Sequence, residues 1–246
     1  MNTTGFPYRI FPLGDSAITI DFGNCIDEAI NENVIQQFNK IRQDPFPGFI
    51  EALPSYSALT LFYDPVLLRK TIPAGTTAYE WVKSKAAEIL QDLTATESPA
   101  ARFFKIPVCY DTNWAKDLSA LAMAKNLDIE EVVHIHTTTI YKVFMLGFLP
   151  GFPYMGEVDK RIEMPRKTQP HSILSGSVGI AGRQTGIYPM DSPGGWQIIG
   201  RTPLKLFDSS KEESSLLKTG DRVEFYSISK EDFDTIKEAE DKNRES

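Results

Sequence analysis

Three stretches of the chain combine glycine, proline and aromatic residues at spacings that could build a ligand site. They cover residues 141–156, 176–189 and 192–203. Proline fixes φ and glycine lets other groups approach the backbone closely, so such stretches can set aromatic walls beside backbone N–H groups that bind an anion. None holds the Gly-Lys-Ser/Thr of a P-loop or a G-x-G-x-x-G fingerprint. Taken singly, each stretch is also consistent with a structural turn or hairpin that packs its own rings.

Basic residues gather in the same region. Between Lys160 and Lys205 there are seven Lys and Arg residues against two acidic ones, which gives +5 inside a chain whose net charge is −7. Arg can hold a carboxylate or a phosphate with two parallel hydrogen bonds, so a cationic, aromatic and glycine-rich region suits such a ligand. The alternative is a docking face for an acidic partner protein.

Composition and cysteine usage argue against several other classes of protein. An acidic chain with a pI near 5.1 is a poor candidate for sequence-independent nucleic-acid binding. Cys25 and Cys109 are the only cysteines, so a reducing compartment fits better than a disulfide framework. His134 and His136 would point to different faces of a helix, and we expect no metal site. Without a signal-peptide pattern or a long apolar run, we expect a cytoplasmic protein with no membrane partner.

The first hundred residues alternate between strand and helix patterns. Runs of β-branched and aromatic residues predict strands at 18–22, 49–53, 58–63 and 102–108. Apolar residues at helical spacing predict helices at 27–42 and 77–93. The order β-α-β-β-α-β is that of a ferredoxin-like sandwich. Residues 94–100 are polar and turn-rich, and we expect them to link a first domain, 1–100, to a second, 101–246.

The second half changes character at Gly147. Before it we expect a helical stretch at 114–126, a helix that begins after Asp128 as the N-cap, and a strand at 140–146. After it, short strands alternate with Gly and Pro turns, the pattern of a β-barrel or sandwich, and we place them at 178–181, 196–199, 203–207 and 222–228. The charged tail, 229–246, predicts one amphipathic helix built on Phe233 and Ile236.

Six ordered motifs carry a resemblance to a known family. They are 106–110, His136-Thr137, 147–154, 176–182, 184–189 and 192–203, and 12–17 and 63–65 also fit. Together they resemble the family of the 5-oxoprolinase B subunit, which includes the sporulation-kinase inhibitor KipI and is also called allophanate hydrolase subunit 1. The resemblance spans roughly residues 8 to 235.

The resemblance implies a fold and a reaction. The fold would be α+β, with a ferredoxin-like N-terminal domain followed by a cyclophilin-like β-barrel domain. The chain would be one component, with little or no activity alone, of a complex that hydrolyses 5-oxo-L-proline to L-glutamate with ATP. A larger C subunit and a lactam-binding A subunit would be its partners. ATP with Mg would be a co-substrate, and no tightly bound cofactor is expected.

The same resemblance suggests which residues would form the site. Anion contacts would come from Arg166, Arg183 and Arg201, walls from Phe152, Tyr154, Tyr188 and Trp196, and polar groups near the reaction from His136, Ser177 and Gln184. One stretch departs from the family. Relatives usually carry Val-Pro-Ala-Gly-Ser after a basic stretch, whereas this chain has Ile173-Leu174-Ser175-Gly176-Ser177 after Pro170-His171-Ser172, with one residue fewer. A basic side chain expected there is missing, which leaves the anion contacts near 170–175 open.

Two rival functions stay open at this point. One is a KipI-like inhibitor of a sensor histidine kinase. The other is a component of an amidohydrolase that acts on allophanate or a related urea derivative. The sequence alone does not say where ATP binds, which protein of the complex supplies the general base, or how many copies assemble.

Overall fold

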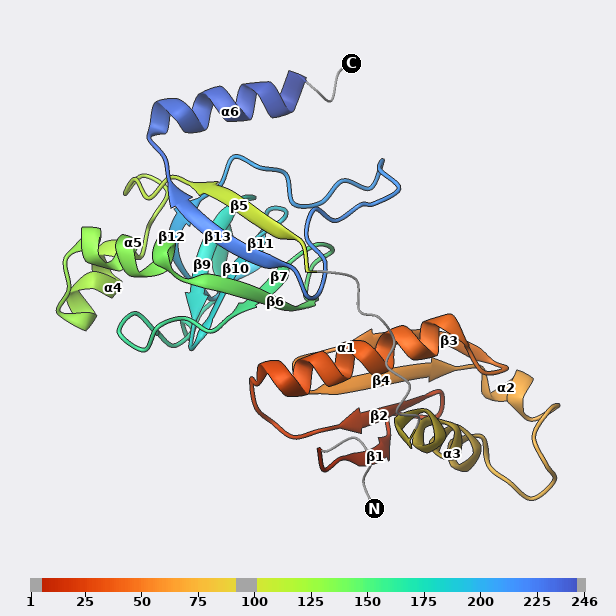
Figure 1. Ribbon diagram of the computed structural model, residues 1–246. Helices are drawn as coiled ribbons and strands as arrows, with labels where there is room; N and C mark the ends of the chain where they lie inside the picture. Colours follow the sequence, from red (N-terminus) through yellow and green to blue (C-terminus); the bar gives the residue numbers. More distant parts are fainter. Residues whose placement is uncertain (1–5, 92–100, 243–246) are drawn as a thin grey trace. The chain divides into compact units, whose positions relative to one another are not determined.

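The computed structural model describes residues 6–91 and 101–242. The chain divides into two compact units, Met1–Ala100 and Ala101–Ser246 (Figure 1). The expected linker at 94–100 lies outside the described residues. Within the described residues, no helix is both long enough and apolar enough to cross a membrane.

The first unit is a four-stranded antiparallel sheet with helices packed on it. Its strands follow the order β1-β2-β4-β3. The strands are β1 (Arg9–Pro12), β2 (Ala17–Asp21), β3 (Phe49–Pro54) and β4 (Ala58–Tyr63). The helices are α1 (Glu28–Gln43), α2 (Pro65–Leu68) and α3 (Ala78–Gln91). The core forms where alternating strand residues meet the apolar stripes of α1 and α3, among them Ile18, Ile20, Leu59, Leu61, Val34, Ile41, Val82 and Leu90.

Side chains at the helix starts explain where α1 and α3 begin. The Asp27 carboxylate accepts a hydrogen bond from Ile30 N at 2.9 Å. At α3, Thr77 Oγ1 accepts from Glu80 N, while the Glu80 carboxylate accepts from Thr77 N at 3.0 Å. Both patterns satisfy N–H groups that a helix leaves free at its first turn. The two predicted helices are therefore confirmed.

One strand predicted for this sandwich forms as expected but belongs to the sheet of the second unit. The stretch expected to complete the sandwich forms β5 (Phe103–Val108), which pairs in parallel with β13 (Arg222–Ser227) of the second unit. Beside β2 lies instead the N-terminal β1, a four-residue strand whose side chains are mostly exposed. A short, exposed strand that ends at Pro12 gives almost no hydrophobic alternation, so the sequence pattern misses it.

The second unit is built on a seven-stranded sheet that curls into a half-barrel. Its strand order is β12-β9-β10-β7-β6-β13-β5. The strands not yet given are β6 (Ile140–Leu146), β7 (Pro153–Gly156), β9 (Ser177–Ala181), β10 (Gln184–Ile187) and β12 (Gln197–Arg201). The two edges meet just beyond β5, where Cys109 N donates to Arg201 O at 2.8 Å and Arg201 N donates back to Cys109 O at 2.9 Å. The sheet therefore closes on itself at this end.

Helices and a small second sheet cover parts of the half-barrel. α4 (Leu118–Lys125) and α5 (Ile129–Thr138) lie beside it, and α5 packs on β13 (Figure 1). Asp128 is the N-cap of α5 as predicted, although its side chain makes no capping hydrogen bond. β8 (His171–Ile173) pairs with β11 (Ser192–Gly194) in a two-stranded sheet.

The C-terminal helix and one loop complete the unit. α6 (Lys230–Lys242) confirms the predicted helix in the charged tail, and Phe233 is its one buried residue among those described. The strand expected at 203–207 is wrong. There only Phe207 makes an isolated bridge, to Ser215, because Pro203 has no N–H to donate to a ladder.

Candidate functional site

Five aromatic side chains gather on the outer face of the half-barrel. Met155 on β7 points into the main core, so its neighbour Tyr154 points to the opposite face. There the Phe152 ring lies 4.8 Å from Tyr154, 5.1 Å from Tyr188 and 5.3 Å from Trp196, measured between ring centroids. Phe148 packs edge-on against Phe152 at 5.8 Å. We call these five residues the aromatic cluster.

Phe148 is the exposed member of the aromatic cluster. It is 60% exposed, whereas Phe152, Tyr188 and Trp196 are buried against one another. Its φ is +68°, a value that a residue with a side chain seldom adopts. Sequence reasoning included its motif but not Phe148 itself among the site residues. The sequence signal that could have identified Phe148 is its position directly after a glycine and before Leu-Pro-Gly.

Three glycines of the motifs make room for these rings. A Cβ added to Gly186 would lie 2.8 Å from the Phe152 ring, and one added to Gly179 would lie 3.1 Å from Trp196 Cβ. A Cβ on Gly194 would meet the Tyr188 hydroxyl and Ile173. All three glycines lie in paired strands. They therefore serve ring packing, and the sequence-based interpretation of such glycines as an anion cradle gains no support at these positions.

Arg166 lies beside the aromatic cluster on a segment that is held at both ends. Lys167 N donates to Gly195 O at 2.7 Å, and Gln197 Nε2 donates to Pro165 O at 2.8 Å. The Arg166 guanidinium lies close to Gly195, within 4.0 Å of where a Cβ there would stand. Its side chain is exposed, and none of the ion pairs found in the described part of the chain includes it.

The positive charge of Arg166 acts on the two tyrosines of the cluster. Burial raises the pKa of Tyr188 to about 12, while a backbone hydrogen bond from Trp196 and then the Arg166 charge oppose the rise. Burial likewise raises the pKa of Tyr154, again opposed by Arg166. Both phenols therefore stay protonated near neutral pH and can donate a hydrogen bond. Arg166, Tyr154 and Phe148 together present a cation, a hydroxyl and an aromatic face.

His136 lies in the core and not at this surface. Its ring is fully buried, with Nδ1 2.8 Å from the Tyr110 hydroxyl and Nε2 3.1 Å from Thr185 Oγ1. It stacks on Phe225 at 4.6 Å between centroids. Burial lowers the pKa of His136 to about 3, so the ring is neutral. The buried ring, with both nitrogens bonded, lies away from the aromatic cluster, so its position gives no support to the catalytic role predicted for His136.

Three further predicted residues lie in or beside β9 and β10. Arg183 sits in the turn between these strands and pairs with Glu157. Gln184 begins β10 and is half-buried, and Ser177 begins β9 and is buried. The Ser177 carbonyl accepts from Tyr188 N at 2.9 Å, which aligns the two strands.

Arg201 lies in a separate cleft next to α6. Its Nε donates to Ser175 O at 2.8 Å, and its guanidinium carbon lies 5.8 Å from the ring centroids of both Trp114 and Phe233. A cavity of about 260 Å³ opens there, lined by residues that include Arg201, Ser175 and Phe233. The ten predicted residues are therefore spread over the outer aromatic face, the two ends of the β9–β10 pair, the barrel core and this cleft.

Comparisons with known proteins agree with the motifs. The family described as carboxyltransferase domain, subdomain C and D, matches residues 8–217. The 5-oxoprolinase B subunit of Bacillus subtilis (strain 168) is 46% identical over 233 residues, which cover 94% of this chain and 97% of that protein. The chain belongs to this family. It is thus a member of the carboxyltransferase-domain family that contains the 5-oxoprolinase B subunit.

Solved structures that resemble this chain support the fold. The crystal structure of TTHA0988 matches 87% of this chain with a TM-score of 0.72 and 32% identity, and the match covers 40% of TTHA0988. The urea carboxylase of Kluyveromyces lactis matches 95% of this chain with a TM-score of 0.75. That match covers 23% of the enzyme at 20% identity, so it bears on the fold alone.

The stretch that departs from the usual family sequence shapes the Arg201 cleft. Ser175 N donates to Asp191 Oδ1 at 2.7 Å, and Ser175 Oγ donates to Pro189 O at 3.1 Å. The hydroxyl bond requires a side-chain donor at this position, which the alanine expected from the family resemblance would not supply. Ser175 therefore fixes the carbonyl that accepts from Arg201 Nε. Within 6–91 and 101–242, no three His, Cys, Asp or Glu side chains gather as a metal site would need.

Proposed function

We propose that the chain is the B subunit of an ATP-dependent 5-oxoprolinase, which converts 5-oxo-L-proline, ATP and water into L-glutamate, ADP and phosphate. The observation that supports this most is the 46% identity to the B. subtilis protein over 97% of its length. Because the similarity extends over nearly all of both chains, the proposal concerns the whole chain and not one domain. In this role the chain has little or no activity alone.

The chemistry explains what the chain has to contribute. A lactam is a poor electrophile, and transfer of a phosphoryl group to its oxygen creates a leaving group. Cations and hydrogen-bond donors around that oxygen stabilise the negative charge that develops. We propose that the surface formed by Arg166, Tyr154 and Phe148 faces the substrate, since it combines a cation without an ion pair found in the described residues with a protonated phenol.

We propose that partner subunits complete the site. The segment of TTHA0988 that resembles this chain makes up 40% of that protein, so there it is joined to a longer chain. A separate, larger C subunit would supply the missing part here, and an A subunit would bind the lactam. Arg183 and Gln184 stay predictions as further contacts at the turn between β9 and β10, and Ser177 stays one at the opposite end of β9.

ATP would be a co-substrate of the complex. Mg²⁺ usually binds through substrate phosphates and several waters with one or two carboxylates, so it would arrive with ATP. The ferredoxin-like and cyclophilin-like descriptions of the two units are also proposals. The order β2-β4-β3 with α1 and α3 supports the first, and the closure at Cys109 and Arg201 supports a barrel in the second. A cytoplasmic location stays a prediction, which cell fractionation would test.

Two other functions are rivals to this proposal. They are inhibition of a sensor histidine kinase, as by KipI, and hydrolysis of allophanate or a related urea derivative. The near full-length similarity to a 5-oxoprolinase component favours the lactam reaction over both. A kinase autophosphorylation assay with the purified chain, and an assay with allophanate in place of 5-oxoproline, would distinguish them.

Reconstitution tests the proposed function. The chain is mixed with the C and A subunits from the same genome, and release of L-glutamate from 5-oxo-L-proline is followed with and without ATP. We expect glutamate only when ATP and all three proteins are present, with each omission as a control. Absence of glutamate from the complete, folded mixture would contradict the proposal.

A further inference from the structure

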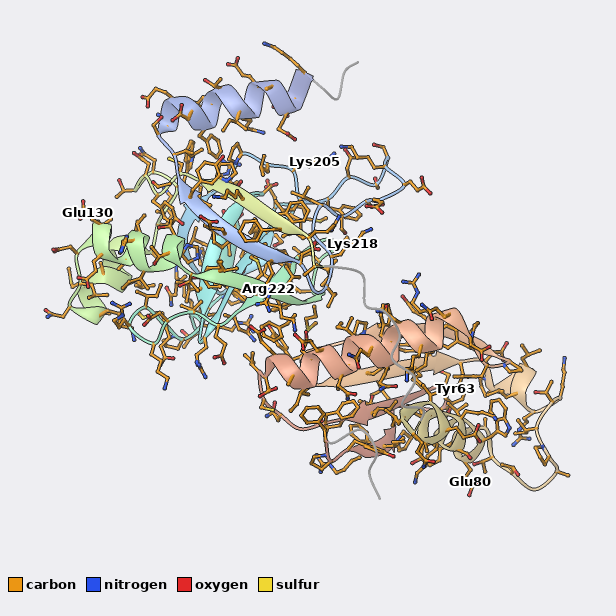
Figure 2. The ribbon with its side chains drawn as sticks, in the orientation of Figure 1. Tyr63, Glu80, Glu130, Lys205, Lys218 and Arg222 are labelled. Carbon is orange, nitrogen blue, oxygen red and sulfur yellow. The ribbon has the colours of Figure 1, made fainter. Side chains whose placement is uncertain are left out.

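The cleft next to α6 is lined by charged and polar side chains of the kind that bind small ligands. It lies between α6, the end of β12 and the loop that follows β12. Lys205, labelled in Figure 2, lies on that loop and lines the same cavity as Lys237 and Glu240 of α6. The cavity measures about 260 Å³, which is large enough for a small metabolite and small for a nucleotide. It contains none of the five aromatic-cluster residues.

α6 is attached to the barrel in a way that leaves this cleft beneath it. The helix begins at Ser229, whose Oγ accepts from Asp232 N at 3.0 Å. Phe233 then inserts against Trp114, with ring centroids 4.1 Å apart. Beyond Phe233 the described helix buries no further residue, so the side chains of its second half face the cleft or solvent.

Arg201 is the residue of this cleft whose hydrogen-bond donors are available to a ligand. Its Nε donates to Ser175 O, and the Trp114 and Phe233 rings lie together on one side of the guanidinium. Among the described residues, no acceptor is found for Nη1 or Nη2. Burial lowers the pKa of Arg201, although the Asp191 charge opposes this. Neither Nη atom is among the buried side-chain atoms that lack a partner, so both are open to water or to a ligand that enters the cleft.

A purely structural role for Arg201 explains only part of this arrangement. Contact with two rings and one bond to a carbonyl would hold α6 on the barrel. That role uses one side of the guanidinium and Nε, whereas Nη1 and Nη2, the edge that binds oxyanions in a bidentate manner, have no acceptor among the described residues. The cavity lies at this residue.

The charges that line the cleft restrict the ligand. Lys205 is paired with Asp208 at 2.7 Å, and Lys237 with Asp241 at 3.5 Å. Asp191 and Glu240 add negative charge to the lining. Acidic groups in the lining repel a polyanion such as ATP more strongly than a ligand with one carboxylate, such as an amino acid or a cyclic amino-acid derivative.

We propose that this cleft binds a small carboxylate through Nη1 and Nη2 of Arg201, at a site separate from the aromatic cluster. The proposal stands on the geometry of the cleft and goes beyond the proposed function. L-glutamate and 5-oxo-L-proline are the probes that follow from it, one with an ammonium group and one without. Inorganic phosphate and ATP are the contrasting anions.

The three tryptophans allow the site to be located directly. Trp81 packs on Phe46 in the first unit, Trp114 lies beside Arg201, and Trp196 belongs to the aromatic cluster. In ¹H–¹⁵N spectra of the isolated chain the three indole signals are assigned with Trp→Phe variants. On titration with L-glutamate or 5-oxo-L-proline we expect the Trp114 signal to move while those of Trp81 and Trp196 stay. Binding that moves only Trp196, or no signal, would overturn the proposal.

Matched variants test the role of each charge. Arg201→Lys keeps the charge but loses the planar fork, so we expect affinity to fall at least about tenfold, with an unchanged spectrum elsewhere. Glu240→Gln removes a negative charge from the lining and should tighten binding a few-fold. Glu238→Gln makes the same change on the same helix outside the cleft and should leave affinity unaltered.

Two further results of these titrations would contradict binding of a carboxylate at Arg201. Unchanged affinity in both Arg201→Lys and Glu240→Gln would overturn the proposal, as would binding of phosphate or ATP in preference to both carboxylates. The measurement needs neither partner proteins nor turnover. A complex that fails to hydrolyse 5-oxoproline would therefore contradict the proposed function and leave this result standing.

Discussion

The Phe152 ring rests directly on the backbone of Gly186. A Cβ added to Gly186 would lie 2.8 Å from Cζ of the ring and 2.9 Å from the carbonyl oxygen of Pro153 on the neighbouring strand β7. Both separations are shorter than van der Waals contact, so the paired strands and the ring leave no space for a side chain there. The aromatic cluster thus depends on a glycine in the middle of a sheet.

Gly186→Ala should lower the free energy of unfolding by about 2 kcal/mol, because the added methyl overpacks a rigid contact. Chemical denaturation of the purified chain measures the change. In a Phe152→Leu background the penalty should shrink, since the ring is gone, but not vanish, since Pro153 O remains. An equal penalty in both backgrounds would show that the ring does not set the constraint.

Gly186 also shows which features of the site can be predicted from the sequence. The glycine spacing in 176–189 was visible, but spacing does not tell whether a glycine exposes an N–H or makes room for a ring that is 34 residues away in the chain. That distinction needs the pairing of β10 with β7, which brings Phe152 over Gly186. Strand pairings between distant segments follow from tertiary packing and not from local pattern.

The elements with a strong local signal were predictable. α1 and α3 have capping side chains and apolar stripes, and both were found in the sequence. β1 was missed because it is short and exposed, and 102–108 was assigned to the wrong sheet because an isolated strand does not reveal its partner. His136 was recognised as part of a motif, but its burial depends on Tyr110, Thr185 and Phe225 from three other segments.

The buried His136 should make stability steeply dependent on pH in the acidic range. Its pKa is about 3 in the folded chain, against an ordinary value of 6.5. Below pH 6.5 the unfolded chain binds a proton that the folded chain does not, so its contribution to the free energy of unfolding falls by about 1.4 kcal/mol per pH unit until pH approaches 3. Above pH 6.5 this group has no effect on the slope.

Denaturation of wild type and His136→Gln from about pH 3.5, just above the pKa of His136 in the folded chain, to about pH 8, above its ordinary pKa, tests this. The stability difference between the two proteins should narrow as the pH falls, because only the wild type carries the buried ring. His134→Gln replaces an exposed ring on the same helix and leaves His136 in place. The free energy of unfolding of this variant should therefore fall with decreasing pH as steeply as that of the wild type. Parallel pH profiles of wild type and His136→Gln would contradict the assignment.

Two ion pairs connect neighbouring strands β5 and β13, and they should differ in strength. One joins Arg102, just before β5, to Asp221, just before β13, and the other joins Lys105 of β5 to Glu224 of β13. Arg102 binds Asp221 with Nε at 3.0 Å and Nη2 at 2.6 Å, and Asp221 also accepts from Lys218 N at 2.6 Å. Asp221 is buried, whereas Lys105 and Glu224 form an exposed pair at 3.4 Å. Asp221→Asn should cost about 2 kcal/mol of unfolding free energy, since it weakens several charge-assisted bonds at once.

Glu224→Gln is the matched control on the same strand. An exposed pair contributes little, so this change should cost less than about 0.5 kcal/mol. Thermal or urea unfolding of the two variants beside the wild type measures both values. If the two substitutions cost the same, burial of Asp221 does not strengthen its bonds as argued.

Arg166 is the residue on which the proposed substrate surface depends most. Its guanidinium lies next to Gly195 and acts electrostatically on Tyr154 and Tyr188, while its backbone neighbours are fixed by Gly195 O and Gln197. In the reconstituted complex, Arg166→Ala should lower kcat/KM for 5-oxoproline by roughly 100- to 1,000-fold, the range expected when one donor to a developing anion is lost. The kcat/KM of Arg166→Lys should lie between the values of the wild type and of Arg166→Ala, because lysine keeps the charge without the bidentate edge.

Arg161→Ala provides the control for this measurement. Arg161 is an exposed arginine five residues earlier in the same basic stretch, but it pairs with Asp159 at 2.9 Å and takes no part in the contacts of the aromatic cluster. Its removal should leave kcat/KM unchanged, and both variants should show wild-type unfolding curves because both side chains are exposed. Wild-type kinetics in Arg166→Ala would remove this surface from the site, whereas equal losses in both variants would point to the overall charge of the stretch and not to the position of Arg166.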